Sequence, residues 1–222
     1  MLKIVIDDDY SFYANGLKAI LHDLFFPELD DGTLLCNNSI ADDISTADII
    51  IKSFSMGEIC TCQPLFRSRK HNSLLIGLYD ENQNPYFSPL PLCIRDILYI
   101  KRSESLAVVK RTILEGWFKS QQGNRRLFSC AGCRHRTLSS QQANVATLFF
   151  LEESVESIAR IMKISTKTVC AHKRILMKNF HLKSDQDLLY FLNKLNGKLH
   201  TPNIFSERLS TLRRTKESLR ET

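Results

Sequence analysis

Nine side chains between residues 165 and 183 have types and spacing that suit contact with a nucleic acid. Five of them are Lys or Arg, and the stretch contains no Asp or Glu. An Arg guanidinium such as that of Arg174 can bridge two acceptors on the edge of a guanine, whereas Lys side chains more often meet phosphates. We therefore predict that double-stranded DNA is contacted by Ser165, Lys167, Thr168, Cys170, Ala171, Lys173, Arg174, Lys178 and Lys183.

Short helices must position these side chains, and the cap signals predict four of them. Ser139 with Gln142 has the spacing of a capping box at the start of the first helix. Ser154 and Ser165 can cap helices over 155–162 and 166–180, and Ser184 can cap a fourth that carries Leu188 to Leu195. Two short helices three residues apart are typical of a helix-turn-helix, whose second helix lies in the major groove, and Ser165 and Thr168 would meet phosphate at its start.

The stretch 166–180 also has an apolar side. Val169, His172, Leu176 and Phe180 recur at spacings of three and four, which is the pattern of a helix packed on a core. We interpret His172 as a packing residue. We expect no catalytic residue in this protein and no enzyme activity.

These positions resemble a known family. The matching residues form the LuxR-type (GerE-like) helix-turn-helix signature over about 57 residues: Leu138-Ser139, Gln142, Ser157-Ile158-Ala159, Ile164-Ser165, Thr168-Val169, His172, Lys178 and Leu182-Lys183-Ser184. The resemblance implies an all-α, four-helix DNA-binding domain whose last helix mediates dimerisation, here through Leu188, Leu189 and Leu192. Three positions depart from the family pattern, namely Glu152, Cys170 and Asp185.

The first half of the chain has a different pattern. Near-continuous apolar runs at 2–6, 47–51, 73–79 and 96–100 predict strands that are buried on both faces, as in a parallel sheet. Helical spacing follows over Tyr10–Leu24 and Leu106–Phe118. This alternation predicts an α/β domain with a doubly wound parallel sheet.

Asp7-Asp8 after the first run and Gly16-Leu17-Lys18-Ala19-Ile20-Leu21 are similar to the receiver domain of response regulators. A receiver holds magnesium on such acids, accepts phosphate on an Asp after the third strand, and has a Lys after the fifth, which Lys101 matches. Ser53 stands at the place of the phosphoaccepting Asp, and a hydroxyl without a general base cannot replace that carboxylate. We therefore expect a degenerate receiver site at Asp7, Asp8, Ser53 and Lys101 that accepts no phosphate.

The acids of this site allow two interpretations. Asp7 and Asp8 could bind a divalent cation, or they could cap the first helix and favour its positive end. We favour the second interpretation and expect no cofactor. Cys130 and Cys133 with His135 lack a second pair of ligands nearby, so we expect no metal there either.

Charge divides the chain into two parts. Residues 1–118 carry 11 Lys and Arg against 16 Asp and Glu, whereas residues 119–222 carry 19 against 8. This asymmetry predicts two domains with different partners. The expected organisation is a receiver-like domain at 1–118, a basic linker at 119–137, a helix-turn-helix domain at 138–196, and a mobile or marginally helical basic tail at 197–222.

The chain has no sequence signal for a membrane or for secretion. Its longest apolar runs are four or five residues, against the roughly 20 that a membrane span needs. Its N-terminus lacks a secretion signal, and its seven scattered cysteines fit free thiols in a reducing compartment. We expect a cytoplasmic protein with no membrane partner.

Two functions follow from these patterns. The first is a DNA-binding transcriptional regulator that needs no phosphorylation and pairs with itself or with a related LuxR-type regulator. Atypical members of that family control bacterial surface structures such as fimbriae or capsule. The alternative is an interaction protein that modulates another regulator through its receiver-like domain, with little specific DNA binding of its own.

Overall fold

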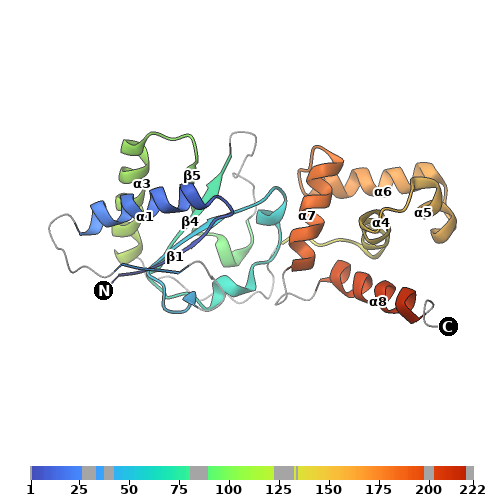
Figure 1. Ribbon diagram of the computed structural model, residues 1–222, viewed down its shortest axis with the longest axis horizontal. Coiled ribbons are helices and arrows are strands. Elements are labelled where there is room, and N and C mark those ends of the chain that lie inside the picture. Colours follow the sequence, from blue (N-terminus) through green and yellow to red (C-terminus); the bar gives the residue numbers. More distant parts are fainter. Residues whose placement is uncertain are drawn as a thin grey trace. The chain divides into compact units, whose positions relative to one another are not determined.

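The computed structural model describes residues 2–26, 34–37, 43–80, 90–122, 133, 135–197 and 203–218. The chain forms two compact units (Figure 1). Unit 1 comprises Met1–Phe54 and Cys62–Arg134, and unit 2 comprises Ser55–Thr61 and His135–Thr222. Within the ranges given above, no helix is long and apolar enough to cross a membrane. Cys130 and most of the predicted linker, 123–132 and 134, lie outside the described residues.

Unit 1 is built on a sheet of five parallel strands in the order β2-β1-β3-β4-β5. The predicted parallel sheet is thus confirmed. The sequence analysis missed one strand, β2, because its four residues are too short a run to stand out. The strands are β1 (Leu2–Asp7), β2 (Leu34–Asn37), β3 (Ile49–Ser53), β4 (Leu74–Tyr79) and β5 (Leu98–Lys101).

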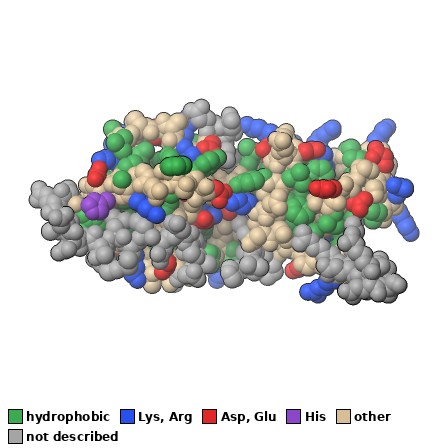
Figure 2. Space-filling view, in the orientation of Figure 1, with side chains coloured by type: hydrophobic (Ala, Val, Ile, Leu, Met, Phe, Trp, Pro, Cys, Tyr) green, Lys and Arg blue, Asp and Glu red, His purple; other side chains and the backbone are tan. Residues whose placement is uncertain are grey.

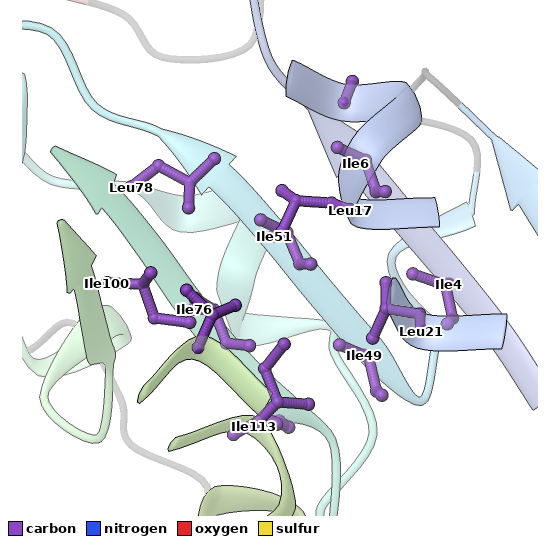
Figure 3. Close-up of a cluster of buried hydrophobic side chains, with 13 residues drawn as sticks. Ile4, Ile6, Leu17, Leu21, Ile49, Ile51, Ile76, Leu78, Ile100 and Ile113 are labelled. Carbon is purple, nitrogen blue, oxygen red and sulfur yellow. The ribbon is translucent and has the colours of Figure 1, made fainter. Parts of the chain in front are cut away.

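Two helices cover one face of this sheet. They are α1 (Ser11–Phe25) and α3 (Leu106–Gln122). Alternate residues of the strands, such as Ile51 and Ile76, point towards Leu17 and Leu21 of α1 and Ile113 of α3 (Figure 3). This cluster is the main core of unit 1.

Helix α3 continues four residues beyond the predicted end at Phe118. Its last turn is held by Gln121, whose amide exchanges hydrogen bonds of 2.8 and 3.1 Å with the side chain and backbone carbonyl of Asn72. Further back, α3 lies so close to the sheet that a Cβ on Gly116 would come within 2.3 Å of Leu98 Cδ1. A side chain at position 116 would therefore displace the Leu98 side chain, and the glycine lets this helix lie close to the strands.

The chain between β3 and β5 is less regular. Over the described residues of this region the helices are short 3-10 turns, η1 (Glu58–Cys60), η2 (Pro64–Arg67) and η3 (Leu92–Ile94). Phe66 and Ile94 bring buried apolar side chains from η2 and η3. Backbone amides of this region donate to two thiols, which are weak acceptors: Gln63 N donates to Cys93 Sγ at 3.3 Å, and Leu92 N donates to Sγ of the more distant Cys133 at 3.2 Å.

Unit 2 is all-helical in its described part beyond residue 138, and its first four helices begin where the cap signals predicted. The hydroxyls of Ser139, Ser154 and Ser165 accept hydrogen bonds from Gln142 N, Ser157 N and Thr168 N at 3.3, 3.1 and 3.1 Å. Ser184 Oγ accepts likewise from Asp187 N. The helices are α4 (Ser140–Phe150), α5 (Val155–Met162), α6 (Thr166–Asn179), α7 (Asp185–Gly197) and α8 (Ile204–Ser218).

The last of these helices corrects the expectation of a mobile or marginally helical tail. Phe205 and Leu209 of α8 are buried, and the Phe205 ring meets Phe150 of α4 edge-on at 5.6 Å. Asn203 and Ser206 both donate to the backbone carbonyl of Leu195 at 3.1 Å, which ties the start of α8 to the end of α7. Two apolar contacts and this polar junction therefore fix a helix that its composition alone does not favour.

A short segment distant in sequence also belongs to unit 2. Gly57, which precedes η1, has φ +80, and a Cβ there would lie 3.0 Å from Phe191 and 3.1 Å from the Phe180 carbonyl. The backbone amide of Arg136 donates to the Cys60 carbonyl at 2.8 Å. The sequence analysis did not predict this placement, because it counted residues 55–61 with the first domain.

The packing of α8 can be tested by truncating Phe205. Phe205→Ala removes a fully buried ring, so we expect the free energy of unfolding to fall by about 3–5 kcal/mol. Urea denaturation followed by far-UV circular dichroism measures the loss. Ser210→Ala, an exposed change on the same helix, is the control and should cost under about 0.5 kcal/mol. Equal stability of the Phe205→Ala and Ser210→Ala variants would mean that α8 is not packed.

Candidate functional site

The joint between α5 and α6 sets the geometry of a helix-turn-helix. Lys163 ends α5 in the left-handed conformation, with φ 54, and Ile164 N donates to the Ala159 carbonyl at 3.0 Å. Ser165 then caps α6. The three predicted residues of the turn are confirmed, and the half-buried Ile164 packs on the core that α4, α5 and α6 share.

The apolar side of α6 is buried as predicted. Val169, Leu176 and Phe180 are at most 1% exposed, and the rings of Phe180 and Phe191 lie 4.6 Å apart. His172 is half-buried on the same side. This packing leaves the opposite side of α6 to solvent.

Most of the predicted DNA-contacting residues lie on that solvent side. Figure 2 shows Lys and Arg side chains projecting along the edge where Figure 1 places α6. Thr168 is half-buried, and its hydroxyl lies 2.8 Å from that of Ser165. The exposed members of the set are Ser165, Lys167, Cys170, Ala171, Arg174, Lys178 and Lys183.

Lys173 is placed differently from the other basic residues of α6. Its ammonium group lies 2.8 Å from the Asp185 carboxylate at the start of α7 and 4.9 Å from the centre of the Phe149 ring. Its side chain is only 21% exposed. Lys173 is thus held by its own domain, and Asp185, one of the departures from the family pattern, is the acid that holds it.

The predicted dimerisation residues of α7 are mostly internal. Leu188 and Leu192 are completely buried in the core of unit 2, and Leu189 is half-buried. This packing leaves Leu188 and Leu192 no surface for a partner. The large apolar side chain that α7 does expose is Tyr190, at 49%.

The degenerate receiver residues gather at one edge of the sheet in unit 1. Asp7 Oδ2 pairs with Lys52 Nζ at 2.7 Å, and the two residues are register partners on β1 and β3. Asp8 does not pair with Lys101. Instead, Arg102 Nη1 and Nη2 donate to the two oxygens of Asp8 at 2.8 and 2.6 Å.

Arg102 was not singled out by the sequence analysis, which took Lys101 as the basic residue of this edge. Strand alternation gives the reason that Arg102 occupies the place. Ile100 points into the core that α1 and α3 cover, so Arg102 has the same orientation and Lys101 the opposite one. The backbone amide of Arg102 donates to the Tyr79 carbonyl at 3.0 Å and so continues the pairing of β5 with β4.

Two opposing effects act on the pKa of Arg102. Burial disfavours the charged guanidinium, but the hydrogen bond to Asp8 and the charges of Asp8 and Asp80 outweigh it, so the pKa is raised. Burial also raises the pKa of the neighbouring Tyr13 hydroxyl, while the charge of Arg102 lowers it. The site of Arg102 therefore favours the charged form of its guanidinium.

Comparison with known proteins bears on both units. Residues 136–192 match the family described as bacterial regulatory proteins, luxR family. A comparison with curated protein sequences finds no match. Among solved structures, the chain is similar to the two-component response regulator RcsB in complex with DNA, with 16% sequence identity, coverage of 86% of this chain and 98% of that chain, and a TM-score of 0.52.

A second similar structure contains two RcsB dimers bound to two parallel DNAs. Its identity is 16%, its coverage is 86% of this chain and 98% of that chain, and its TM-score is 0.50. At this identity the likeness concerns the fold, a receiver-like α/β domain followed by a helix-turn-helix domain. The family match concerns the second domain alone. Residues 136–192 of this chain therefore form a helix-turn-helix domain of the luxR family of bacterial regulatory proteins.

Proposed function

We propose that this protein is a transcriptional regulator that binds specific sequences in double-stranded promoter DNA through the exposed side of α6. The observation that carries the proposal is the division of α6 into a buried apolar side and an exposed side with Lys167, Arg174 and Lys178 and no acid. A helix whose orientation is fixed by the helix before it, here α5, can lie in the major groove of DNA. Promoter DNA lies in the cytoplasm of a bacterium, which would be the place of action.

The exposed side chains divide into two roles. Arg174 lies in the middle of α6 and has the fork geometry that reads guanine, so it would contribute to sequence preference. Ser165, Lys167, Thr168, Lys178 and Lys183 would contact phosphates, which fix the position of the helix without reading sequence. Cys170 and Ala171 are small enough to let the α6 backbone approach the bases.

The receiver-like domain would act without phosphorylation. Ser53 ends β3, and its hydroxyl accepts a hydrogen bond from Arg102 at 3.0 Å. The guanidinium is a cation and cannot take the hydroxyl proton, as a general base would have to do to activate it. Regulation would then come from pairing with a second copy or with a related LuxR-type regulator. By the same family resemblance, the target genes would include those for surface structures such as fimbriae or capsule.

The alternative function, modulation of another regulator with little DNA binding, is favoured by one observation. The pair of Lys173 and Asp185 removes one cation from the DNA-facing set and adds an acid beside it. Genome-wide footprinting and co-purification distinguish the two functions. Specific footprints support the first, and a co-purifying regulator without footprints supports the second.

The roles of Arg174 and Lys178 predict different effects of two substitutions. Arg174→Ala should weaken binding to the preferred site by about 1–3 kcal/mol and change the sequence preference. Lys178→Ala should weaken binding to all sequences and lower the salt slope by about 1. Gel shifts at several salt concentrations, on a selected site and on scrambled DNA, measure both effects.

The control for these variants is Lys110→Ala. Lys110 lies on α3 in unit 1, where its nearest acid is Asp23 at 3.5 Å, so the substitution removes the same charge away from the proposed interface. If Lys110→Ala weakens binding as much as Lys178→Ala, the effect is one of net charge and the proposed interface is wrong.

The pair of Lys173 and Asp185 predicts a gain of affinity. Asp185→Asn removes a negative charge from the DNA side and releases Lys173 for a phosphate, so binding should strengthen by about 0.5–1 kcal/mol, which is a few-fold in affinity. Fluorescence anisotropy with labelled duplex measures it. Asp23→Asn, the loss of a comparable surface acid in unit 1, is the matched control and should have no effect. Unchanged or weaker binding of Asp185→Asn would contradict the placement of Lys173.

A further inference from the structure

We propose that the guanidinium of Arg102 is a permanent internal cation of the receiver-like domain, held where a receiver would hold a divalent metal ion. The group lies at the edge of the sheet where β1, β3, β4 and β5 end. This proposal goes beyond DNA binding and holds whether or not α6 reads a promoter.

Strand alternation brings the ligands of this cation together. Asp8, Ser53, Asp80 and Arg102 each lie two residues after a core residue of a different strand, namely Ile6, Ile51, Leu78 and Ile100. Side chains two residues apart along a strand point the same way, so these four converge on one side of the edge. Ser53 is the last residue of β3, and the other three directly follow the ends of β1, β4 and β5, so the site lies where these strands end.

The oxygen atoms of the site are already used by Arg102. The Asp8 side chain is completely buried, and both of its oxygens accept hydrogen bonds from the guanidinium at 2.6 and 2.8 Å. Ser53 Oγ accepts a third at 3.0 Å, and Asp80 Oδ1 forms an ion pair with Nε at 3.2 Å. Such a bidentate pair is the strongest common arrangement of Arg with a carboxylate.

Aromatic rings enclose the same guanidinium. Its central carbon lies 4.7 Å from the centre of the Tyr10 ring and 4.8 Å from that of Tyr13, both at the start of α1. Rings at this distance attract a cation through their negatively charged faces. The guanidinium side chain has 12% exposure, so it is held by groups from four elements with little access for water.

A magnesium ion does not fit this arrangement. Mg²⁺ needs six oxygen ligands at about 2.0–2.1 Å, several of them waters. The Asp8 oxygens face the guanidinium, and Asp7 is paired with Lys52 at 2.7 Å. A divalent ion would also meet the positive charge of Arg102 within a few ångströms, where like charges repel strongly. Lys52 and Arg102 thus neutralise Asp7 and Asp8 without a metal ion.

Replacing Arg102 should therefore create a site that the protein lacks. Arg102→Met keeps the apolar stem beside Tyr13 and leaves the Asp8, Asp80 and Ser53 oxygens without their cation. Terbium is a suitable probe, because excitation of nearby Tyr10 and Tyr13 sensitises its emission. We expect Arg102→Met to bind Tb³⁺ at least about tenfold more tightly than the unchanged protein, since a unit charge at contact distance outweighs that factor, and we expect Mg²⁺ to compete.

Three variants separate this site from other acidic surfaces. Asp8→Asn combined with Arg102→Met should abolish the new binding. Lys110→Met removes a distant cation of unit 1 and should create no site. Arg102→Lys retains a positive charge and should bind no better than the unchanged protein. If Arg102→Met does not fold, Arg102→Gln takes its place in the same measurements.

Two results would overturn the proposal. One is Tb³⁺ or Mg²⁺ binding by the unchanged protein with the affinity of the Arg102 variants. The other is a folded Arg102→Met or Arg102→Gln variant whose Tb³⁺ emission does not differ from that of the Asp8→Asn double variant. A rise in melting temperature with Mg²⁺ in the single variant alone is the supporting result.

Discussion

Burial of the apolar side of α6 is the constraint on which the proposed recognition surface depends. Val169, Leu176 and Phe180 are packed into the core of unit 2, so the helix cannot rotate without exposing them. Because residues advance by 100° along a helix, fixing these three also fixes the direction of Arg174 and Lys178. The position of the cations is thus decided by residues that carry no charge.

In unit 1, too, buried apolar residues fix the direction of a charged side chain, but there the charge points into the domain. There the alternation that buries Ile100 turns Arg102 towards Asp8, and the charge is neutralised inside the domain. On α6 of unit 2, Lys173 forms an ion pair with an acid of its own domain, Asp185. Cations with internal partners serve the fold, and cations left to solvent remain free to meet an anion such as DNA.

Local chemistry made much of this structure predictable. The starts of α4, α5 and α6 followed from Ser139, Ser154 and Ser165, because an N-cap involves only residues within one turn. Helix α8 was not predictable in this way, since it is held by Phe205 against Phe150, a contact made across 55 residues of chain. Arg102 was missed because the basic residue of this edge was assigned by its match to the family pattern, which gave Lys101. The alternation of side chains along the strand can be read from the sequence, and it favours Arg102.

The placement of residues 55–61 follows from the same distinction between local and distant contacts. The local sequence around Gly57 and Cys60 does not predict their distant contacts. Gly57 lies against Phe180 and Phe191, and the Cys60 carbonyl accepts a hydrogen bond from the backbone amide of Arg136. These contacts lie where α6 ends and α7 packs on it. A segment that follows directly on Ser53 and Phe54 therefore completes the core that orients the recognition helix, so the helix-turn-helix domain of this protein is not built from the C-terminal part of the chain alone.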